Sequence, residues 1–130
     1  INGGIRSLEA ALEHLQRVDG AMIGREAYHN PWIFSAADRL VFGDPAPAPS
    51  RRQVLESFAP FVERQLADGI RLQTISRHVL GLFQGQPGAR AWRRHLSEQA
   101  HRRGAGPEVL LQAAELVADG PAPGANAAAD

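Results

Sequence analysis

Apolar residues recur at intervals of three and four along most of this chain, which is the pattern of helices with one buried face. The first such segment, at about residues 7–17, begins at Ser7, whose side chain can cap it. Pro60 should bend or split the helix that contains it. The short loops between the later helices favour a small antiparallel helical bundle. These later helices are predicted at about residues 51–68, 72–83, 89–103 and 107–118.

The first 43 residues also contain two short apolar runs, each of which leads into a glycine turn. Residues 1–5 and 18–23 are predicted to be buried parallel strands, with the helix at 7–17 between them. Two consecutive strand–helix units with such turns bind phosphate at the end of a TIM barrel. The predicted fold is therefore an α/β part, the last two strand–helix units of a TIM barrel, followed by an all-α part, the helical bundle.

The residues at the two turns suit a phosphate group. Asn2, Gly3 and Gly4 make the first turn and Gly24 the second, and glycine lets backbone N–H groups approach an anion closely. Arg25 adds a planar positive charge of the kind that pairs with phosphate. Short glycine turns are also common in ordinary loops, so the spacing alone leaves that interpretation open.

An apolar cluster follows the second turn. Trp32, Ile33 and Phe34 lie between short helices expected at about 26–30 and 35–41, and we expect them to pack beneath the end of the barrel. The cluster would then belong to the barrel rather than to the bundle.

A proline-rich segment predicts the domain organisation. Prolines alternate with small residues at 44–50, which favours an extended, semi-rigid spacer. We expect residues 1–43 to be the end of the barrel and residues 51–119 to be the helical domain. Residues 120–130 are small residues and proline, and we expect a disordered tail there.

Composition excludes several kinds of chemical site but does not indicate a binding partner. The 130-residue chain has a formal net charge of zero, and all 14 basic residues are arginine, a bias typical of a GC-rich genome. Without cysteine there is no disulfide, thiolate zinc site or cysteine nucleophile in this chain. The five histidines show no metal-ligand spacing, so we expect no metal. With no apolar run near the roughly 20 residues of a membrane span, we expect a soluble cytoplasmic protein.

Arginines gather on one face of the helix predicted at 89–103. Arg90, Arg93 and Arg94 lie opposite the apolar residues Trp92 and Leu96. Arginines three and four apart repel one another mildly unless an anion lies between them, and an RNA backbone would supply that anion. The alternative is a solvated face with local pairing to acidic residues such as Glu98. Arg77 and His78 lie outside the apolar stripe of the preceding helix and are weaker candidates.

Four runs of sequence resemble a known family: INGGI at 1–5, VDGAMIGREAY at 18–28, NPW at 30–32, and ISRHVLGLFQGQPGARAWRR at 75–94. The first three resemble the end of the barrel in tRNA-dihydrouridine synthases. The fourth resembles the helical domain of the A-type subfamily. The motifs occur in the family's order and spacing, and the resemblance covers about residues 1–103. Because the chain begins at Ile1 inside a predicted strand, we expect a C-terminal fragment of such an enzyme.

The resemblance implies a flavin enzyme with FMN at the mouth of the barrel. It implies that Asn2, Gly3 and Gly4 form one FMN-phosphate turn, and that Gly24 and Arg25 form the other. In this family NADPH reduces the flavin, hydride passes to a D-loop uridine of tRNA to give 5,6-dihydrouridine, and a cysteine supplies the proton. The target base must leave the tRNA stack to reach the flavin.

The resemblance also implies that the helical domain grips tRNA. Arg90 and Arg93 match positions that orient the tRNA, and Arg94, Arg77 and His78 are further candidates. In the family the catalytic cysteine and the flavin-ring contacts come from upstream residues. We therefore expect this chain to be inactive alone and the full-length enzyme to be a monomer.

Two other interpretations fit parts of the sequence. An FMN-dependent TIM-barrel oxidoreductase acting on a small molecule would share the phosphate turns but would not need the arginine face. A non-catalytic RNA-binding helical module would use residues 51–119 without the first 43 residues. Salt-dependent affinity for tRNA separates the first alternative from the synthase, and bound flavin in the full-length protein separates the second.

Overall fold

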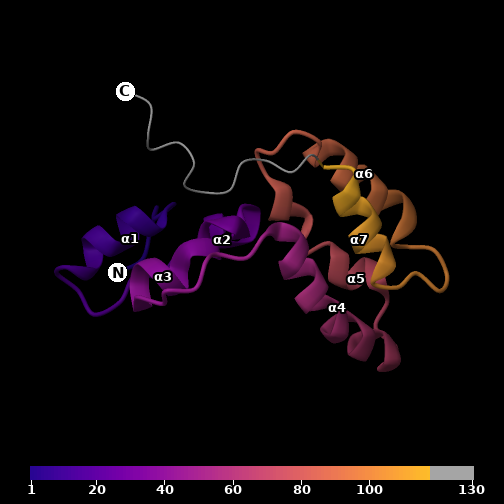
Figure 1. Cartoon of the computed structure of the whole chain (residues 1–130), viewed down its shortest axis with the longest axis horizontal. Helices are drawn as coiled ribbons and strands as arrows, with labels where there is room; N and C mark the ends of the chain where they lie inside the picture. The colour runs from indigo at the N-terminus through magenta and orange to yellow at the C-terminus, as the bar shows by residue number, and fades with distance from the viewer. Residues whose placement is uncertain (118–130) are drawn as a thin grey trace.

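The structure, a computed structural model, describes residues 1–117, which form an elongated molecule with two lobes (Figure 1). Helices α1 and α3 lie at one end, α4 to α7 form the other lobe, and α2 lies between them. The α-helices are α1 Leu8–Leu15, α2 Arg25–His29, α3 Ala37–Phe42, α4 Arg51–Ala67, α5 Leu72–Ser76, α6 Ala89–Gln99 and α7 Glu108–Glu115. Two 3-10 helices, η1 Pro31–Ala36 and η2 Leu80–Phe83, complete the described elements.

The two predicted strands do not form within residues 1–117, where one parallel bridge joins Asn2 to Met22. The Met22 amide donates to the carbonyl oxygen of Ile1 over 2.9 Å. A parallel ladder grows only where strands have neighbours to bond, and in this part of the chain the two segments pair only with each other. The expectation of a buried strand at 18–23 is also wrong, because Val18 and Met22 are exposed.

Helix α1 follows its local sequence signals. The Ala10 amide donates to the Ser7 hydroxyl over 3.1 Å, which confirms the predicted cap. The helix buries Leu8 and Ala11, and Ile5 is buried nearby. This small apolar group, with α3 packed against α1, is the interior of the first lobe.

The second lobe has one continuous core. Helix α7 packs on both α4 and α6, and Trp92 on α6 is fully buried with its ring 4.7 Å from that of Phe83. The buried core consists of Leu55, Val62, Leu72, Ile75, Leu82, Phe83, Ala89, Trp92, Leu96, Ala100, Val109, Leu110, Ala113 and Val117. Helices were predicted at 51–68, 89–103 and 107–118, and α4, α6 and α7 confirm them with shorter ends.

Helix α4 begins at a capping box and passes through a proline. The Gln53 amide donates to the Ser50 hydroxyl, and the Ser50 amide donates to the Gln53 side chain. Pro60 does not split the helix, contrary to one predicted outcome. Proline removes one helical hydrogen bond, and Pro60 lies on an exposed face, where water can satisfy the carbonyl that loses its donor.

The prediction of one helix over 72–83 is wrong. The chain leaves α5 at Ser76, turns, and re-forms as η2. Apolar residues at 72, 75, 79 and 82 fit one helix, but two short turns also bury Leu72, Ile75 and Leu82. The carbonyl groups that the break frees are bonded by side chains from other elements, which stabilises the irregular path.

The predicted spacer at 44–50 contains no helix, but it does not keep the two lobes apart. Helix α2 and η1 both contact η2. The division into domains at 1–43 and 51–119 stays a prediction, and the predicted tail at 120–130 lies outside the described residues.

Two leucines of the last helical segment provide a matched test of the core. Leu110 is 1% exposed, whereas Leu116 is 51% exposed. Leu110→Ala should lower the free energy of unfolding by about 2–5 kcal/mol, because it leaves a cavity. Leu116→Ala should change it by about 0.5 kcal/mol or less. Urea denaturation followed by circular dichroism measures both, and equal effects would contradict this core.

The first lobe exposes apolar side chains that should cause self-association. Ile1, Met22, Leu40 and Val41 are exposed, and Phe42 is 79% exposed. We expect the 130-residue chain to form concentration-dependent oligomers in sedimentation experiments, and Phe42→Glu to weaken them. A monodisperse monomer at every concentration would contradict this expectation.

Candidate functional site

A pocket of about 320 Å³ lies between the two glycine turns and α2. All five residues predicted to hold phosphate line it: Asn2, Gly3, Gly4, Gly24 and Arg25. The bridge between Asn2 and Met22 brings the turns together, although 20 residues of chain separate them. The fold therefore places both turns at one site, which we call the phosphate pocket after the ligand that the sequence predicts.

The first turn needs glycine because of its backbone. Gly3 and Gly4 have φ angles of 118° and 71°, a region that side-chain-bearing residues rarely adopt. A Cβ at either position would meet no atom within 4 Å, so the space in front of the turn is open. The requirement is conformational, and the turn presents bare backbone to the pocket.

Charged side chains that the sequence interpretation did not predict also line the pocket. Arg6 and Glu26 join Arg25 there, and His29 lies at the end of α2. Two guanidinium groups against one carboxylate leave an excess of positive charge around the glycine turns. Closeness in sequence to the two turns could have identified them, because Arg6 follows the first turn by two residues and Glu26 directly follows Arg25.

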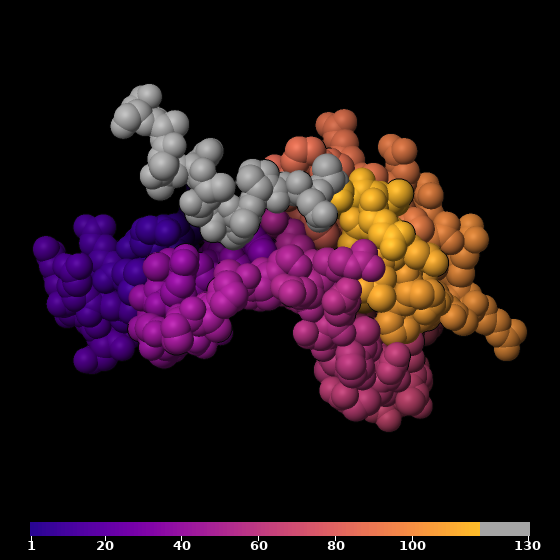
Figure 2. All heavy atoms as spheres, viewed as in Figure 1, coloured from indigo at the N-terminus to yellow at the C-terminus, as the bar shows by residue number. Residues whose placement is uncertain are grey.

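The arginine face, defined as Arg90, Arg93 and Arg94, lies on α6. Arg90 and Arg94 are exposed and Arg93 is half-buried, while Trp92 on the opposite side of the helix is fully buried. Figure 2 shows side chains projecting into solvent from the orange surface that includes α6. Within residues 1–117 the ion pairs join Arg52 to Glu56 and Glu115. The arginine face is therefore not neutralised by Glu98 or by another described carboxylate.

Arg77 and His78 do not lie on the arginine face. Both belong to the break after α5, where Arg77 Nε donates to His78 Nε2 over 3.1 Å. His78 Nδ1 lies 3.1 Å from the Tyr28 hydroxyl. Both ring nitrogens of His78 thus have partners inside the protein, and only the terminal nitrogens of Arg77 remain for an external anion.

The apolar cluster after the second turn corrects another prediction. Trp32 packs against the core of the helical lobe, not beneath a barrel, and Phe34 is exposed. The Arg51 guanidinium lies 4.4 Å from the centre of the Trp32 ring, and its Nε donates to the Leu82 carbonyl over 2.9 Å. Burial lowers the pKa of Arg51 below its ordinary value, but an arginine stays charged at neutral pH.

The described residues offer neither of two other kinds of site. Residues 1–117 contain no group of three or more histidine, aspartate or glutamate side chains placed to hold a metal ion. In the same residues no helix has the length and apolar character needed to cross a membrane.

Residues 1–118 match the model of the family described as Dihydrouridine synthase (Dus). The chain belongs to the dihydrouridine synthase family. This confirms the resemblance that the glycine turns and the 75–94 run carry. The family is a TIM barrel, of which the described residues show helices and a single bridge.

Three curated relatives of this dihydrouridine synthase family member carry the same name. A "tRNA-dihydrouridine(20/20a) synthase" of Vibrio vulnificus is 56% identical over 113 residues, which are 87% of this chain and 35% of the relative. Proteins with the same name from Salmonella typhimurium and Escherichia coli K12 are 56% and 55% identical over 119 residues, or 92% of this chain. The chain spans about a third of the length of these relatives.

The phosphate pocket of this dihydrouridine synthase family member can be tested with inorganic phosphate. Amide resonances of Gly3, Gly4 and Gly24 should shift saturably as phosphate is added. Arg25→Ala should weaken binding about tenfold or more, because a hydrogen bond to a charged group contributes on the order of 1.5–3 kcal/mol. The control Arg39→Ala removes an exposed arginine outside the pocket and should bind as the wild type does. Equal loss in both variants would indicate bulk charge and not a site.

Proposed function

We propose that this chain is part of an A-type tRNA-dihydrouridine synthase, cytoplasmic and monomeric as a full-length enzyme. That enzyme would reduce a D-loop uridine of tRNA to 5,6-dihydrouridine with FMN and NADPH. The observation that carries the proposal is the convergence of five phosphate candidates on one pocket in a member of this family. The shared name of the relatives favours tRNA over a small-molecule substrate.

The pocket fits the phosphate group of FMN. Its first turn has two glycines at positive φ with open space before them, which leaves backbone N–H groups accessible to phosphate oxygens. Arg25 and Arg6 would pair with the phosphate charge, and Arg25 can do so with two parallel N–H bonds. Glu26 opposes an anion and would limit the negative charge that the pocket tolerates.

In this proposal the protein positions the cofactor and the substrate, and the cofactor supplies the redox chemistry. When bound, FMN would accept hydride from NADPH and pass it to the uracil ring. The chain's own residues would hold the phosphate end, so that the flavin lies at a fixed distance from the barrel mouth. The cysteine expected to protonate the uracil would lie outside this chain, which has no cysteine.

The arginine face supports the tRNA part of the proposal. Arg90, Arg93 and Arg94 have no carboxylate partner among the described residues, and they project from a helix whose other side is fixed in the core by Trp92. A rigid row of guanidinium groups can contact successive phosphates of an RNA backbone and release counterions. A small-molecule oxidoreductase would have no use for such a face.

The test is tRNA binding by the 130-residue chain over a salt series. Wild type should bind with a steep fall in affinity as salt rises. Arg90→Ala/Arg93→Ala should bind more weakly and lose roughly two units of the slope of log K against log salt, about one for each phosphate contact removed.

A double variant with the same change of net charge is the control. Arg39→Ala/Arg64→Ala removes two exposed arginines, one on α3 and one on α4. This control should keep both the affinity and the slope of the wild type. If it loses as much as the α6 variant, or if the wild type does not bind tRNA, the arginine face is not a tRNA grip.

A further inference from the structure

Gly81, in η2, lies against the backbone at the end of α2. A Cβ at this position would overlap the carbonyl oxygen of His29, and would lie 2.8 Å from its carbonyl carbon and 3.1 Å from the carbonyl oxygen of Tyr28. These are backbone atoms at the end of α2 and cannot move independently. Gly81 has no positive φ, so the reason for glycine here is space and not conformation.

A hydrogen-bonded ring fixes the same end of α2. Arginine Nε is always a donor, so His78 Nε2 accepts from Arg77 and the ring proton lies on Nδ1. His78 Nδ1 therefore donates to the Tyr28 hydroxyl, and that hydroxyl donates to the Arg77 carbonyl over 3.4 Å. Each donor in the ring has one acceptor. The Tyr28 and His78 rings also meet edge to face, with centres 5.9 Å apart.

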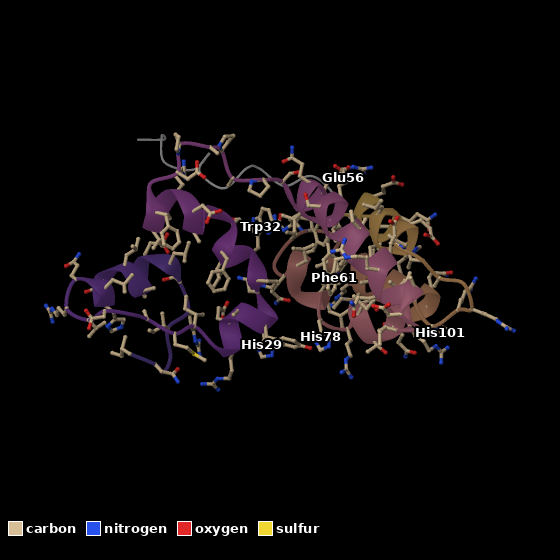
Figure 3. All side chains as sticks on the ribbon, turned by 90° about the horizontal axis from the view of Figure 1, so that it is seen from below. His29, Trp32, Glu56, Phe61, His78 and His101 are labelled. Carbon is tan, nitrogen blue, oxygen red and sulfur yellow. The ribbon has the colours of Figure 1, made fainter. Side chains whose placement is uncertain are left out.

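Helix α2 thus has two functional sides. Arg25, Glu26 and His29 line the phosphate pocket, while Tyr28 and the His29 carbonyl rest on residues 77–81. Figure 3 shows His29 and His78 at the place where α2 meets the segment after α5. The helix has only five residues and no side-chain cap, so it is too short to hold its own geometry.

We infer that residues 77–81 are a seat for α2, with Tyr28 and His78 as positioning residues for the phosphate pocket. The seat is the break between α5 and η2. Because it contacts α2, the position of the helical lobe determines where the pocket-lining residues of α2 lie. His78 is thereby reassigned from RNA contact to pocket geometry. The role of the pocket as a phosphate site rests on the proposed function, whereas the seat itself rests on contacts within the chain.

Gly81→Ala tests the seat without touching the pocket. The added methyl must displace α2, so amide resonances of residues 24–29 should shift in the absence of any ligand, and affinity for inorganic phosphate should fall on the order of tenfold. Gly20→Ala is the matched control, because its Cβ would meet no atom within 4 Å and Gly20 does not line the pocket. It should keep the resonances of residues 25–29 and the phosphate affinity of the wild type.

A second pair of variants covers the case in which Gly81→Ala does not fold. Tyr28 and His78 are exposed, so Tyr28→Phe and His78→Phe keep an aromatic ring at little steric cost and remove its hydrogen bonds. Each should weaken phosphate binding, and the double variant should be no weaker than the worse single one, because the first change already breaks the ring. Additive losses, or unchanged affinity in both single variants, would overturn the positioning role.

The two arms separate failure of the seat from failure of the proposed function. If wild type binds no phosphate but Gly81→Ala still shifts residues 24–29, the pocket assignment is wrong and the seat stands. If phosphate binds and neither Gly81→Ala nor the Tyr28 and His78 variants change the resonances of α2 or the affinity, the seat is wrong and the pocket stands.

Discussion

The structure depends on how the backbone of residues 77–83 satisfies its carbonyl groups. A broken helix leaves carbonyls without amide partners, and buried ones are costly. Here three side chains from three elements supply donors: Tyr28 to the Arg77 carbonyl, Trp92 to Leu80 and Arg51 to Leu82. One irregular segment is therefore bonded to α2, to α6 and to the start of α4. The bond from Tyr28 joins this segment to α2, while the other two bonds join it to helices of its own lobe.

Local signals account for what the sequence predicted correctly. Ser7 and Ser50 mark helix starts because each cap bonds an amide three residues away, and that interaction needs no tertiary contact. Trp92 and Leu96 were expected in the core because their spacing places them on one helical face. The turn at Gly3 and Gly4 could be anticipated because two adjacent glycines suit a backbone that other residues rarely adopt, whereas its role in holding phosphate stays a prediction.

The errors came from interactions between distant residues. Strands at 1–5 and 18–23 need neighbours, and the described residues give each of them only the other. The helix expected at 72–83 is broken by bonds from Tyr28, Arg51 and Trp92, none of which a hydrophobic pattern encodes. The RNA-binding role predicted for His78 stays a prediction, but the pattern gave no sign that its ring contacts Tyr28, 50 residues away in sequence. A polar side chain off the apolar stripe was expected to be free for an external ligand, but contacts in the folded chain engage it.

The chain has two tryptophans, one in the core of the helical lobe and one at the contact between the lobes. Trp92 is sealed in the core of the helical lobe, whereas Trp32 is half-buried under the Arg51 guanidinium where the first lobe meets the second. Intrinsic fluorescence therefore has one source that responds to melting of the core and another that responds to parting of the lobes. Fluorescence of Trp32 can therefore report separation of the lobes, and fluorescence of Trp92 can report unfolding of the core.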